Sequence, residues 1–310
     1  MFKKPKIKLL SAQQIDKNKW DECINQSTNP LIYANTFYLD HLHEKWCGFV
    51  GENYDWVLPI TAGKKWGFYY LYQPSFVQQL GVFAKRGIDV PLADIVACLQ
   101  KHYQFWEINW NYATPHQHLP STIQVRSGAN YILDLSKPYN LIAANYENIL
   151  VKNLKMSKKN NLTYLCSRDY KNCINLYERN YSHRLPQIKT TDYLNLKLLC
   201  EHALANNALL CRQVANEDGE LLATILLLKD KQRLYNIINT TPANGRKVAA
   251  NHFLIDSLIN EFAGTGIILD FEGSDQPGIK KFYEGFGGQN QPYYMLRYNN
   301  LPWPVKLLKD

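Results

Sequence analysis

The stretch that decides the fold reads LDFEGSDQPGIKKFYEGFGG and runs from Leu269 to Gly288. Its opening residues belong to a short apolar run, Ile267 to Phe271, which predicts a buried strand. Pro277 to Glu284 follows as a short helix, and a glycine-rich break separates that helix from a further strand, Tyr293 to Tyr298. The C-terminal part of the chain therefore alternates strands and helices.

The residues before this stretch extend the same alternation. Glu220 to Lys229 is an apolar run of strand length, and Arg233 to Thr240 reads as its hairpin partner across a turn-like Asp-Lys-Gln. Thr241 to Arg246 contains Pro, Asn and Gly, which predicts a loop. From Val248 to Phe262 apolar residues recur at helical spacing. The predicted order is strand, strand, loop, helix, strand.

The N-terminal half repeats this order without repeating the residues. Asp55 to Thr61 and Phe68 to Gln73 read as strands on either side of a turn, Gly63 to Gly67. Val90 to His102 then predicts a helix, and Phe105 to Trp110 a strand. We therefore expect an α/β protein with mixed sheets and two tandem domains of similar architecture.

The domain boundary is expected at a proline-containing break. Asn130 to Leu135 reads as a strand, and the chain then breaks at Ser136-Lys137-Pro138. This places one domain at residues 1–135 and the other, with the chemistry, at 136–310.

Composition limits the class of protein. Seven scattered cysteines without a C-x-x-C pair fit reduced thiols better than a disulfide framework or a zinc site. No run of about 18 apolar residues is present, and no apolar stretch follows the basic N-terminus, so we expect a soluble, cytoplasmic protein without a membrane span. The net charge of +8 either favours anionic partners or serves solubility alone.

An amphipathic helix is expected between the halves, from Tyr139 to Asn161. Tyr146, Leu150 and Leu154 share one face of it. The opposite face gathers three lysines, Lys152, Lys155 and Lys159. These lysines form either a solvated face or a cationic arm for the phosphates of a substrate or an RNA.

The loop before the long helix is a candidate anion site. Asn244-Gly245 allows a tight turn, and the first amides of the following helix lack partners inside it. Arg246 and Lys247 stand beside that helix start and can close on a phosphate group. The alternative is an ordinary junction between a strand and a helix.

Two carboxylates form the second candidate site. On a continuing strand, Asp270 and Glu272 would point to the same face. Such a pair can orient or deprotonate an amine nucleophile. Alternatively, the two side chains cap the next helix or pair with a nearby Lys or Arg.

At this point the residues resemble a known family. GIKKFYEGFG, from Gly278 to Gly287, resembles the FYEK-x-G signature near the end of GNAT acyltransferases. Together with LDFEGS it is most similar to the Fem-type branch, tandem-GNAT proteins that attach amino acids to peptidoglycan precursors. Trp20-Asp21 and the stretch from Asn29 to Phe37 are also similar to that branch. The likeness is specific from Leu269 to Gly287 and covers most of the chain in its order of elements.

The resemblance implies roles for individual residues. Tyr283 takes the place of the tyrosine that protonates the departing thiolate of coenzyme A. The pyrophosphate loop of the family falls on Gly245, Arg246, Lys247, Val248, Ala249 and Asn251. Here the chain departs from the pattern, because Ala249 and Asn251 occupy the two small-residue positions and Asn251 would crowd a close backbone approach. The donor implied is therefore acyl-CoA, such as acetyl-CoA, or another activated donor such as the aminoacyl-tRNA of the Fem branch.

These observations predict an N-acyltransferase that moves an acyl or aminoacyl group to an amine on a small molecule or peptide. Asp270 or Glu272 would act as base and Tyr283 as acid. One alternative is a Fem-type, aminoacyl-tRNA-dependent transferase acting on a peptidoglycan precursor, and another is a non-catalytic GNAT-like binding protein. No DNA partner is expected.

Two features of the N-terminal half are not expected to carry chemistry. No metal is expected, because His41-x-His43 and His116-x-His118 lack a third ligand. The aromatic-rich stretch from Trp46 to Tyr112 reads mostly as core, with part of it available to line an acceptor groove.

Overall fold

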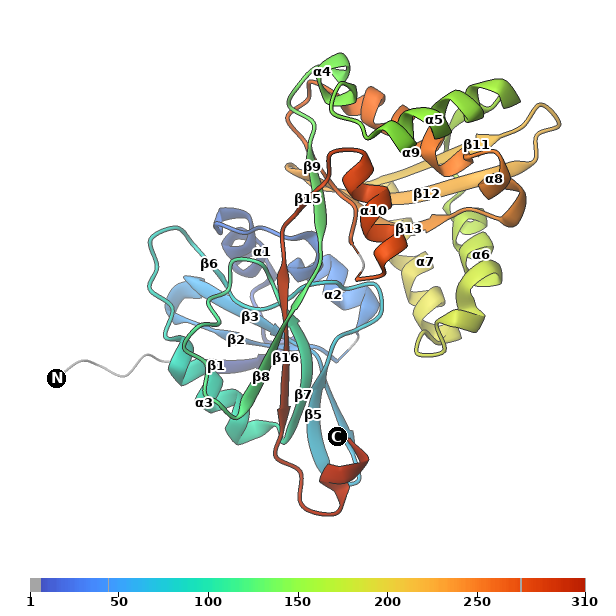
Figure 1. The fold of residues 1–310 in the computed structure, drawn as a ribbon. Helices are drawn as coiled ribbons and strands as arrows, with labels where there is room; N and C mark the ends of the chain where they lie inside the picture. The colour runs from blue at the N-terminus through green and yellow to red at the C-terminus, as the bar shows by residue number, and fades with distance from the viewer. Residues whose placement is uncertain (1–6, 44, 274, 310) are drawn as a thin grey trace. The chain divides into compact units, whose positions relative to one another are not determined.

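The computed structural model describes residues 7–43, 45–273 and 275–309 (Figure 1). The chain forms two compact units, one of residues 1–128 with 292–310 and the other of residues 129–291. Each unit combines helices with a mixed sheet, so the predicted α/β class is confirmed.

The second unit is built on a seven-stranded sheet of order β10-β11-β12-β13-β14-β9-β15. Its strands are β9 (Tyr131–Asp134), β10 (Thr163–Ser167), β11 (Leu209–Ala215), β12 (Leu221–Lys229), β13 (Arg233–Thr240), β14 (Ile268–Asp270) and β15 (Gln289–Asn290). The β12–β13 hairpin forms as predicted, and β14 joins β13 in parallel. The helices are α4 (Tyr139–Ala143), α5 (Asn148–Ser157), α6 (Tyr170–Tyr181), α7 (Thr190–Ala205), α8 (Ala243–Lys247), α9 (Ala250–Phe262) and α10 (Pro277–Gly285).

Helices cover both faces of this sheet, which explains why β12 and β13 are buried along nearly their whole length. In Figure 1, α5 and α9 lie on one side of the sheet, and α6 and α7 on the other. Leu254, Ile255, Leu258 and Ile259 of α9 are buried in the core, as their spacing predicts. Leu150 and Leu154 of α5 join the same core.

Three local predictions in this unit were wrong. The segment expected as a loop is mostly the short helix α8, and α9 begins at Ala250, two residues later than predicted. The cause is Ala249, whose left-handed backbone (φ 54°) breaks the helix between α8 and α9. The helix expected from Tyr139 to Asn161 is divided into α4 and α5.

Strand β13 stops pairing with its parallel neighbour β14 and then contains a β-bulge. Its pairing with β14 ends at Tyr235↔Asp270, while β13 itself continues to Thr240. On the other side, Leu226 faces Ile238 and Leu227 faces Asn236, so Ile237 is an extra residue in the register. Beyond Tyr235, β13 therefore has no strand partner among the described residues on the side where β14 lies.

The first unit holds a four-stranded sheet, β1-β2-β3-β6, and a five-stranded sheet, β4-β5-β7-β16-β8. The first consists of β1 (Lys8–Ser11), β2 (Cys47–Val50), β3 (Trp56–Ile60) and β6 (Phe83–Ala84). The second consists of β4 (Ala62–Lys65), β5 (Phe68–Tyr72), β7 (Phe105–Trp110), β8 (Ile123–Gly128) and β16 (Tyr293–Asn299). The helices are α1 (Lys17–Gln26), α2 (Thr36–Leu42) and α3 (Leu92–His102).

One local prediction in this unit was wrong, because most of the turn expected from Gly63 to Gly67 belongs to strand β4. The strands expected on either side of a turn, β3 and β5, lie in different sheets, and β5 pairs with β4 instead. Trp66 and Gly67 both have positive φ, which closes a two-residue hairpin that turns the chain back six residues after β3 ends.

The last strand, β16, belongs to the first unit and not to the part of the chain that precedes it. It lies between β7 and β8 and pairs antiparallel with both. The division therefore differs from the expected 1–135 and 136–310, because residues from 292 onward fill a gap in the sheet of the first unit. A strand inserted between two others satisfies its backbone hydrogen bonds on both edges.

Candidate active site

A cavity of about 780 Å³ in the second unit collects residues from α6, the end of β13, the α8–α9 junction and α10. Of the residues predicted for the site, Tyr283, Arg246, Ala249 and Asn251 line this cavity. It is the natural place to look for chemistry, because polar groups converge there on a concave, partly apolar surface.

Tyr283 is held by aromatic packing on the cavity wall. Its ring stacks on Phe271 at 4.5 Å between centroids, and the neighbouring Phe286 is completely buried. Burial raises the pKa of Tyr283 above its usual value, and the negative charges of Glu272 and Asp270 raise it further. The hydroxyl therefore stays protonated at neutral pH and can donate a proton.

Glu272 lies beside this tyrosine, although not as predicted. Strand β14 ends at Asp270, and Glu272 has a left-handed backbone (φ 50°), so the two carboxylates do not continue one strand face. Burial raises the pKa of both Tyr283 and Tyr177, and the negative charge of Glu272 raises both further, although Glu272 is not among the residues that line the cavity. A carboxylate in this place can accept a proton from an amine.

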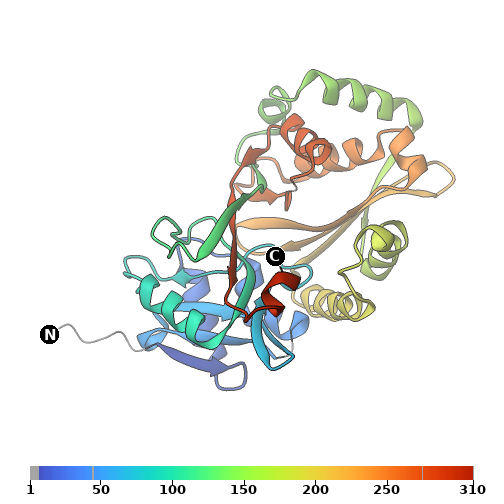
Figure 2. The same ribbon diagram turned by 60° about the horizontal axis from the view of Figure 1, so that its bottom comes forward.

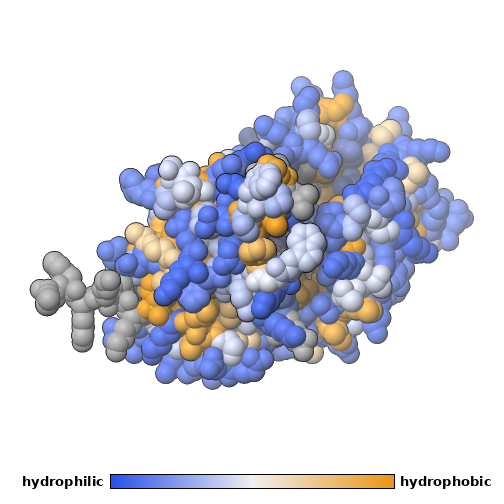
Figure 3. Space-filling model, turned by 90° about the horizontal axis from the view of Figure 1, so that it is seen from below, coloured by the Kyte–Doolittle hydropathy of each residue, from blue (hydrophilic) through white to orange (hydrophobic). Residues whose placement is uncertain are grey.

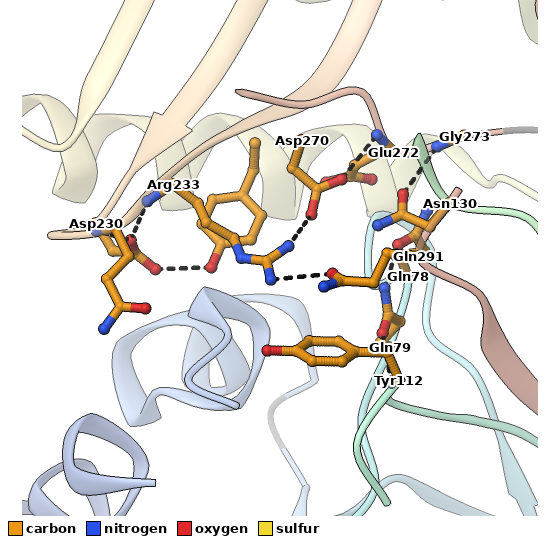
Figure 4. A network of polar contacts seen from close by, with 12 residues as sticks. Gln78, Gln79, Tyr112, Asn130, Asp230, Arg233, Asp270, Glu272, Gly273 and Gln291 are labelled. Atoms are coloured by element: carbon orange, nitrogen blue, oxygen red, sulfur yellow. Dashed lines mark hydrogen bonds and ion pairs between the residues drawn. The ribbon is translucent and has the colours of Figure 1, made fainter. Parts of the chain in front are cut away.

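Asp270 is committed to a buried ion pair (Figure 4). Its Oδ2 lies 2.9 Å from Nη1 of Arg233, and the side chains are 0% and 4% exposed. Its Oδ1 accepts a hydrogen bond of 3.0 Å from the Glu272 amide, and Nη2 of Arg233 donates to Gln291 at 3.0 Å. Burial raises the pKa of Asp270, whereas the adjacent guanidinium opposes that rise. Of the two readings, pairing with an Arg fits Asp270, so it positions Glu272 and does not face a substrate.

The predicted donor loop divides into two parts. Gly245 is buried on α8, where an added Cβ would stand 1.8 Å from the carbonyl oxygen of Leu222 in β12. Its lack of a side chain therefore serves helix–sheet packing. Lys247 is exposed, and Val248 packs on the core. Arg246 donates from Nη1 to the Thr241 carbonyl at 2.6 Å and also lines the cavity.

At the start of α9, the two small-residue positions hold Ala249 and Asn251. The buried Oδ1 of Asn251 has no hydrogen-bond partner among the described residues. An unpaired amide oxygen at a helix start carries a partial negative charge that opposes the approach of an anion. The junction therefore fits a pyrophosphate less well than a loop of small residues would.

The three predicted lysines, Lys152, Lys155 and Lys159, are exposed on α5 and just after it, and they do not line the cavity. This leaves them available to bulk solvent or to a large anionic partner.

The sequence reasoning missed several cavity residues. Tyr177 and Tyr181 project from α6 one helical turn apart, with ring centroids 5.2 Å apart, and Arg184 follows them. His252 lies on the first turn of α9, with Nε2 at 3.0 Å from Nδ2 of Asn153. Burial lowers the pKa of His252 to about 4, so its ring is neutral. The i, i+4 tyrosines could have been noticed, whereas nothing in the sequence marks His252.

Among the described residues, no cluster of three His, Cys, Asp or Glu side chains could hold a metal ion. None of the helices in the described part of the chain is long and apolar enough to cross a membrane.

Comparison with known proteins gives likeness in structure alone. No family model and no curated protein matches the sequence. Among solved structures, FemX aligns with a TM-score of 0.63 at 12% identity, covering 97% of this chain and 99% of its own. A conserved protein of unknown function from Bacteroides thetaiotaomicron VPI-5482 aligns at 0.59 and 12%, covering 91% and 97%. The C-terminal domain of a putative lysylphosphatidylglycerol synthetase from Agrobacterium fabrum aligns at 0.57 and 10%, covering 95% and 94%. The chain thus has the GNAT-like, Fem-type fold that its sequence predicted.

Proposed function

We propose that the protein is an N-acyltransferase that moves an acyl or aminoacyl group from an activated donor to an amine. The observation that carries this proposal is the cavity of the second unit. Tyr283, the start of α9 and the end of β13, which is beyond its pairing with β14, all line this cavity. Glu272 is near enough to contribute to the raised pKa of that tyrosine. A proton donor, a proton acceptor and an anion-binding helix start are what this transfer needs.

The reaction needs positioning more than covalent help from the protein. The amine nitrogen attacks the acyl carbon and gives its proton to Glu272, while the bond from the acyl carbon to the leaving sulfur or oxygen breaks. The leaving atom takes the proton of the Tyr283 hydroxyl. Because the pKa of Tyr283 is raised, this transfer occurs only as negative charge develops on the leaving atom.

A second candidate differs only in the donor. Asn251 stands where a pyrophosphate of acyl-CoA would approach the helix start, and its buried amide oxygen disfavours that approach. An aminoacyl ester on tRNA carries no pyrophosphate there, and the exposed Lys152, Lys155 and Lys159 provide charge for its backbone. Within the Fem-type resemblance, this donor would serve a peptidoglycan precursor as acceptor.

The two donors are distinguished by measuring transfer from acetyl-CoA, longer acyl-CoAs and aminoacyl-tRNA to a panel of amines, including peptidoglycan peptides. With tRNA as donor, retention falls steeply as salt rises, and Lys155→Gln with Lys159→Gln lowers it further. If neither salt nor these substitutions changes retention, tRNA is excluded.

The roles of the two site residues are tested in the same assay. Tyr283→Phe and Glu272→Gln each lower turnover by about 10²–10⁴-fold without lowering the melting temperature. The matched controls are Tyr298→Phe and Glu201→Gln, which make the same chemical changes outside the cavity. Donor binding without transfer to any amine would instead identify a non-catalytic binding protein, and equal turnover of all four variants would refute the role assignments.

A further inference from the structure

Large aromatic side chains are exposed to solvent at one end of the first unit. The chain has seven tryptophans, and five of them, at positions 20, 46, 56, 106 and 110, are buried. Trp66 and Trp303 are instead 68% and 79% exposed. Trp66 belongs to the aromatic-rich stretch that the sequence predicts to be mostly core, and yet it is exposed. Trp303, from the C-terminal part of the chain, is exposed as well.

Two segments distant in sequence meet at this end. One is the turn of the β4–β5 hairpin, and the other is the C-terminal segment after β16, which contains the 3-10 turn Val305–Leu308. Gln104 joins them, since its amide donates to the Tyr69 carbonyl at 3.0 Å and its carbonyl accepts from the Asn300 amide at 2.8 Å. Figures 1 and 2 both draw the C-terminal turn beside β5.

We call this surface the aromatic–basic tip. Its apolar members are Trp66, Tyr69, Trp303 and Leu307, all exposed. Its basic members are Lys64, Lys65, Lys306 and Lys309, also exposed. Figure 3 views the molecule from this end and shows pale and orange side chains interspersed among blue ones.

The tip is a built surface and not a loose end of chain. Nζ of Lys64 lies 4.7 Å from the ring centroid of Tyr69, and Nζ of Lys65 lies at the same distance from Trp66. Lys309 covers Phe105 at 5.1 Å, which ties the C-terminal segment to β7. Lysine stems packed on aromatic rings keep both the rings and the charges at the surface.

The charge of the tip has one sign. None of its four lysines forms an ion pair with an acidic group in the part of the chain that the structure describes. Exposed Trp, Tyr and Leu side chains beside unpaired lysines match the interface of an anionic bilayer, where aromatic rings lie at the headgroup level and lysines contact phosphates.

We propose that the aromatic–basic tip docks the protein on the surface of an anionic membrane, with Trp66 and Trp303 inserted at the headgroup level. A second copy of the chain is a poorer occupant, because a two-fold contact through the tip would oppose its lysines to one another. RNA is also a poorer occupant than a membrane. Its bases would gain nothing from contact with Leu307, and lysines already cover one face of the Trp66 and Tyr69 rings on which bases would stack.

The test uses the full chain with vesicles of phosphatidylcholine containing about one third phosphatidylglycerol. Because five of the seven tryptophans are buried, the two exposed ones dominate the solvent-sensitive part of the emission. We expect the protein to sediment with these vesicles, the emission to shift to the blue, and brominated lipid to quench it. Vesicles of phosphatidylcholine alone and 0.5 M salt weaken the binding.

Substitutions separate the tip from other surfaces. Trp66→Ser with Trp303→Ser lowers the partition coefficient at least about tenfold, and each of Lys64→Gln, Lys65→Gln and Lys306→Gln lowers it about fivefold. The control pairs are Leu194→Ser with Leu198→Ser, which removes two other exposed apolar side chains from α7, and Lys152→Gln with Lys155→Gln on α5. Both control pairs retain vesicle binding.

Three results would overturn the proposal. They are an absence of sedimentation with anionic vesicles, equal losses in the tip and control variants, and retention of single-stranded RNA or an acidic protein by the tip in place of vesicles. The substituted side chains are exposed, so the variants keep the melting temperature of the parent protein, and a loss of binding reports on the surface alone.

Discussion

Gly245 provides the sharpest test of how the site is assembled. The change Gly245→Ala places a Cβ 1.8 Å from the carbonyl oxygen of Leu222, where ordinary contact begins at 3.4 Å. Helix α8 must therefore move away from β12 by about 1.6 Å. The added Cβ is fixed to the backbone of α8 and the atoms that it overlaps are backbone atoms of Leu222, so no side-chain rotation can relieve the overlap.

The cost follows from this overlap. Overpacking of this size destabilises by about 3 kcal/mol, which lowers the melting temperature of a unit of this size by roughly 6–12 °C. The displacement also moves Ala249 and Asn251 on the cavity wall, and a shift of about 1 Å in a reacting group costs about 10²-fold in rate. We expect the variant to lose both stability and acyl transfer.

The assay is urea unfolding followed by circular dichroism, together with the transfer reaction at a temperature where the variant is folded. Gly278→Ala is the matched control for stability alone, because nothing lies within 4 Å of its added Cβ and α10 gains helix propensity, whereas Gly278 itself lines the cavity. We expect that control to be neutral or more stable by up to about 1 kcal/mol. If Gly245→Ala is as stable as Gly278→Ala and only donor binding is lost, Gly245 serves the donor and the packing argument is wrong.

Three further substitutions report on the polar contacts of the second unit. Asp270→Asn leaves Arg233 buried without its carboxylate and costs about 3–5 kcal/mol in urea unfolding; a loss below about 1 kcal/mol would contradict the ion-pair assignment. Arg212→Met costs about 2 kcal/mol at pH 7, because Nη2 of Arg212 lies 2.5 Å from Glu261, which remains partly exposed. Burial acts to raise the pKa of Glu261, but the hydrogen bonds from Arg212 and Tyr164 outweigh it and hold that pKa below its ordinary value. The stability that this pair contributes is therefore complete above the pKa of Glu261 in the unfolded chain and is lost as pH falls through its pKa in the folded protein. The difference in unfolding free energy between variant and parent should thus shrink below about pH 4.5. A difference that stays constant from pH 7 to pH 3 would argue against this ion pair. Asn251→Ala removes the buried, unpartnered amide oxygen and tightens acetyl-CoA binding about tenfold by calorimetry; unchanged affinity would show that the side chain does not obstruct the helix start.

Sequence periodicity was sufficient where a segment's structure depends on its own residues. The β12–β13 hairpin and β7 appear within a residue of their predicted bounds, because long apolar runs and turn residues carry the signal locally. The start of α9 was misplaced because its break depends on Ala249 in a left-handed conformation that no glycine marks.

The candidate site was harder to predict, because its contacts join distant parts of the chain. The partner of Asp270 is Arg233, 37 residues earlier, and nothing local distinguishes a buried, paired aspartate from a catalytic one. Likewise, a glycine required by packing and a glycine required by a ligand look alike in sequence, which is why Gly245 was assigned to the donor.

By itself, the sequence determined the alternation of strands and helices, the Fem-type likeness around LDFEGS and FYEGFGG, and the choice of Tyr283 as a candidate proton donor. Only the tertiary structure decided that β16 completes the sheet of the first unit, that Tyr177 and His252 share a cavity with Tyr283, and that Trp66 and Trp303 are both exposed. The physical reason is that periodicity records which face of an element is buried, whereas strand insertion, ion pairing and cavity formation depend on which elements meet.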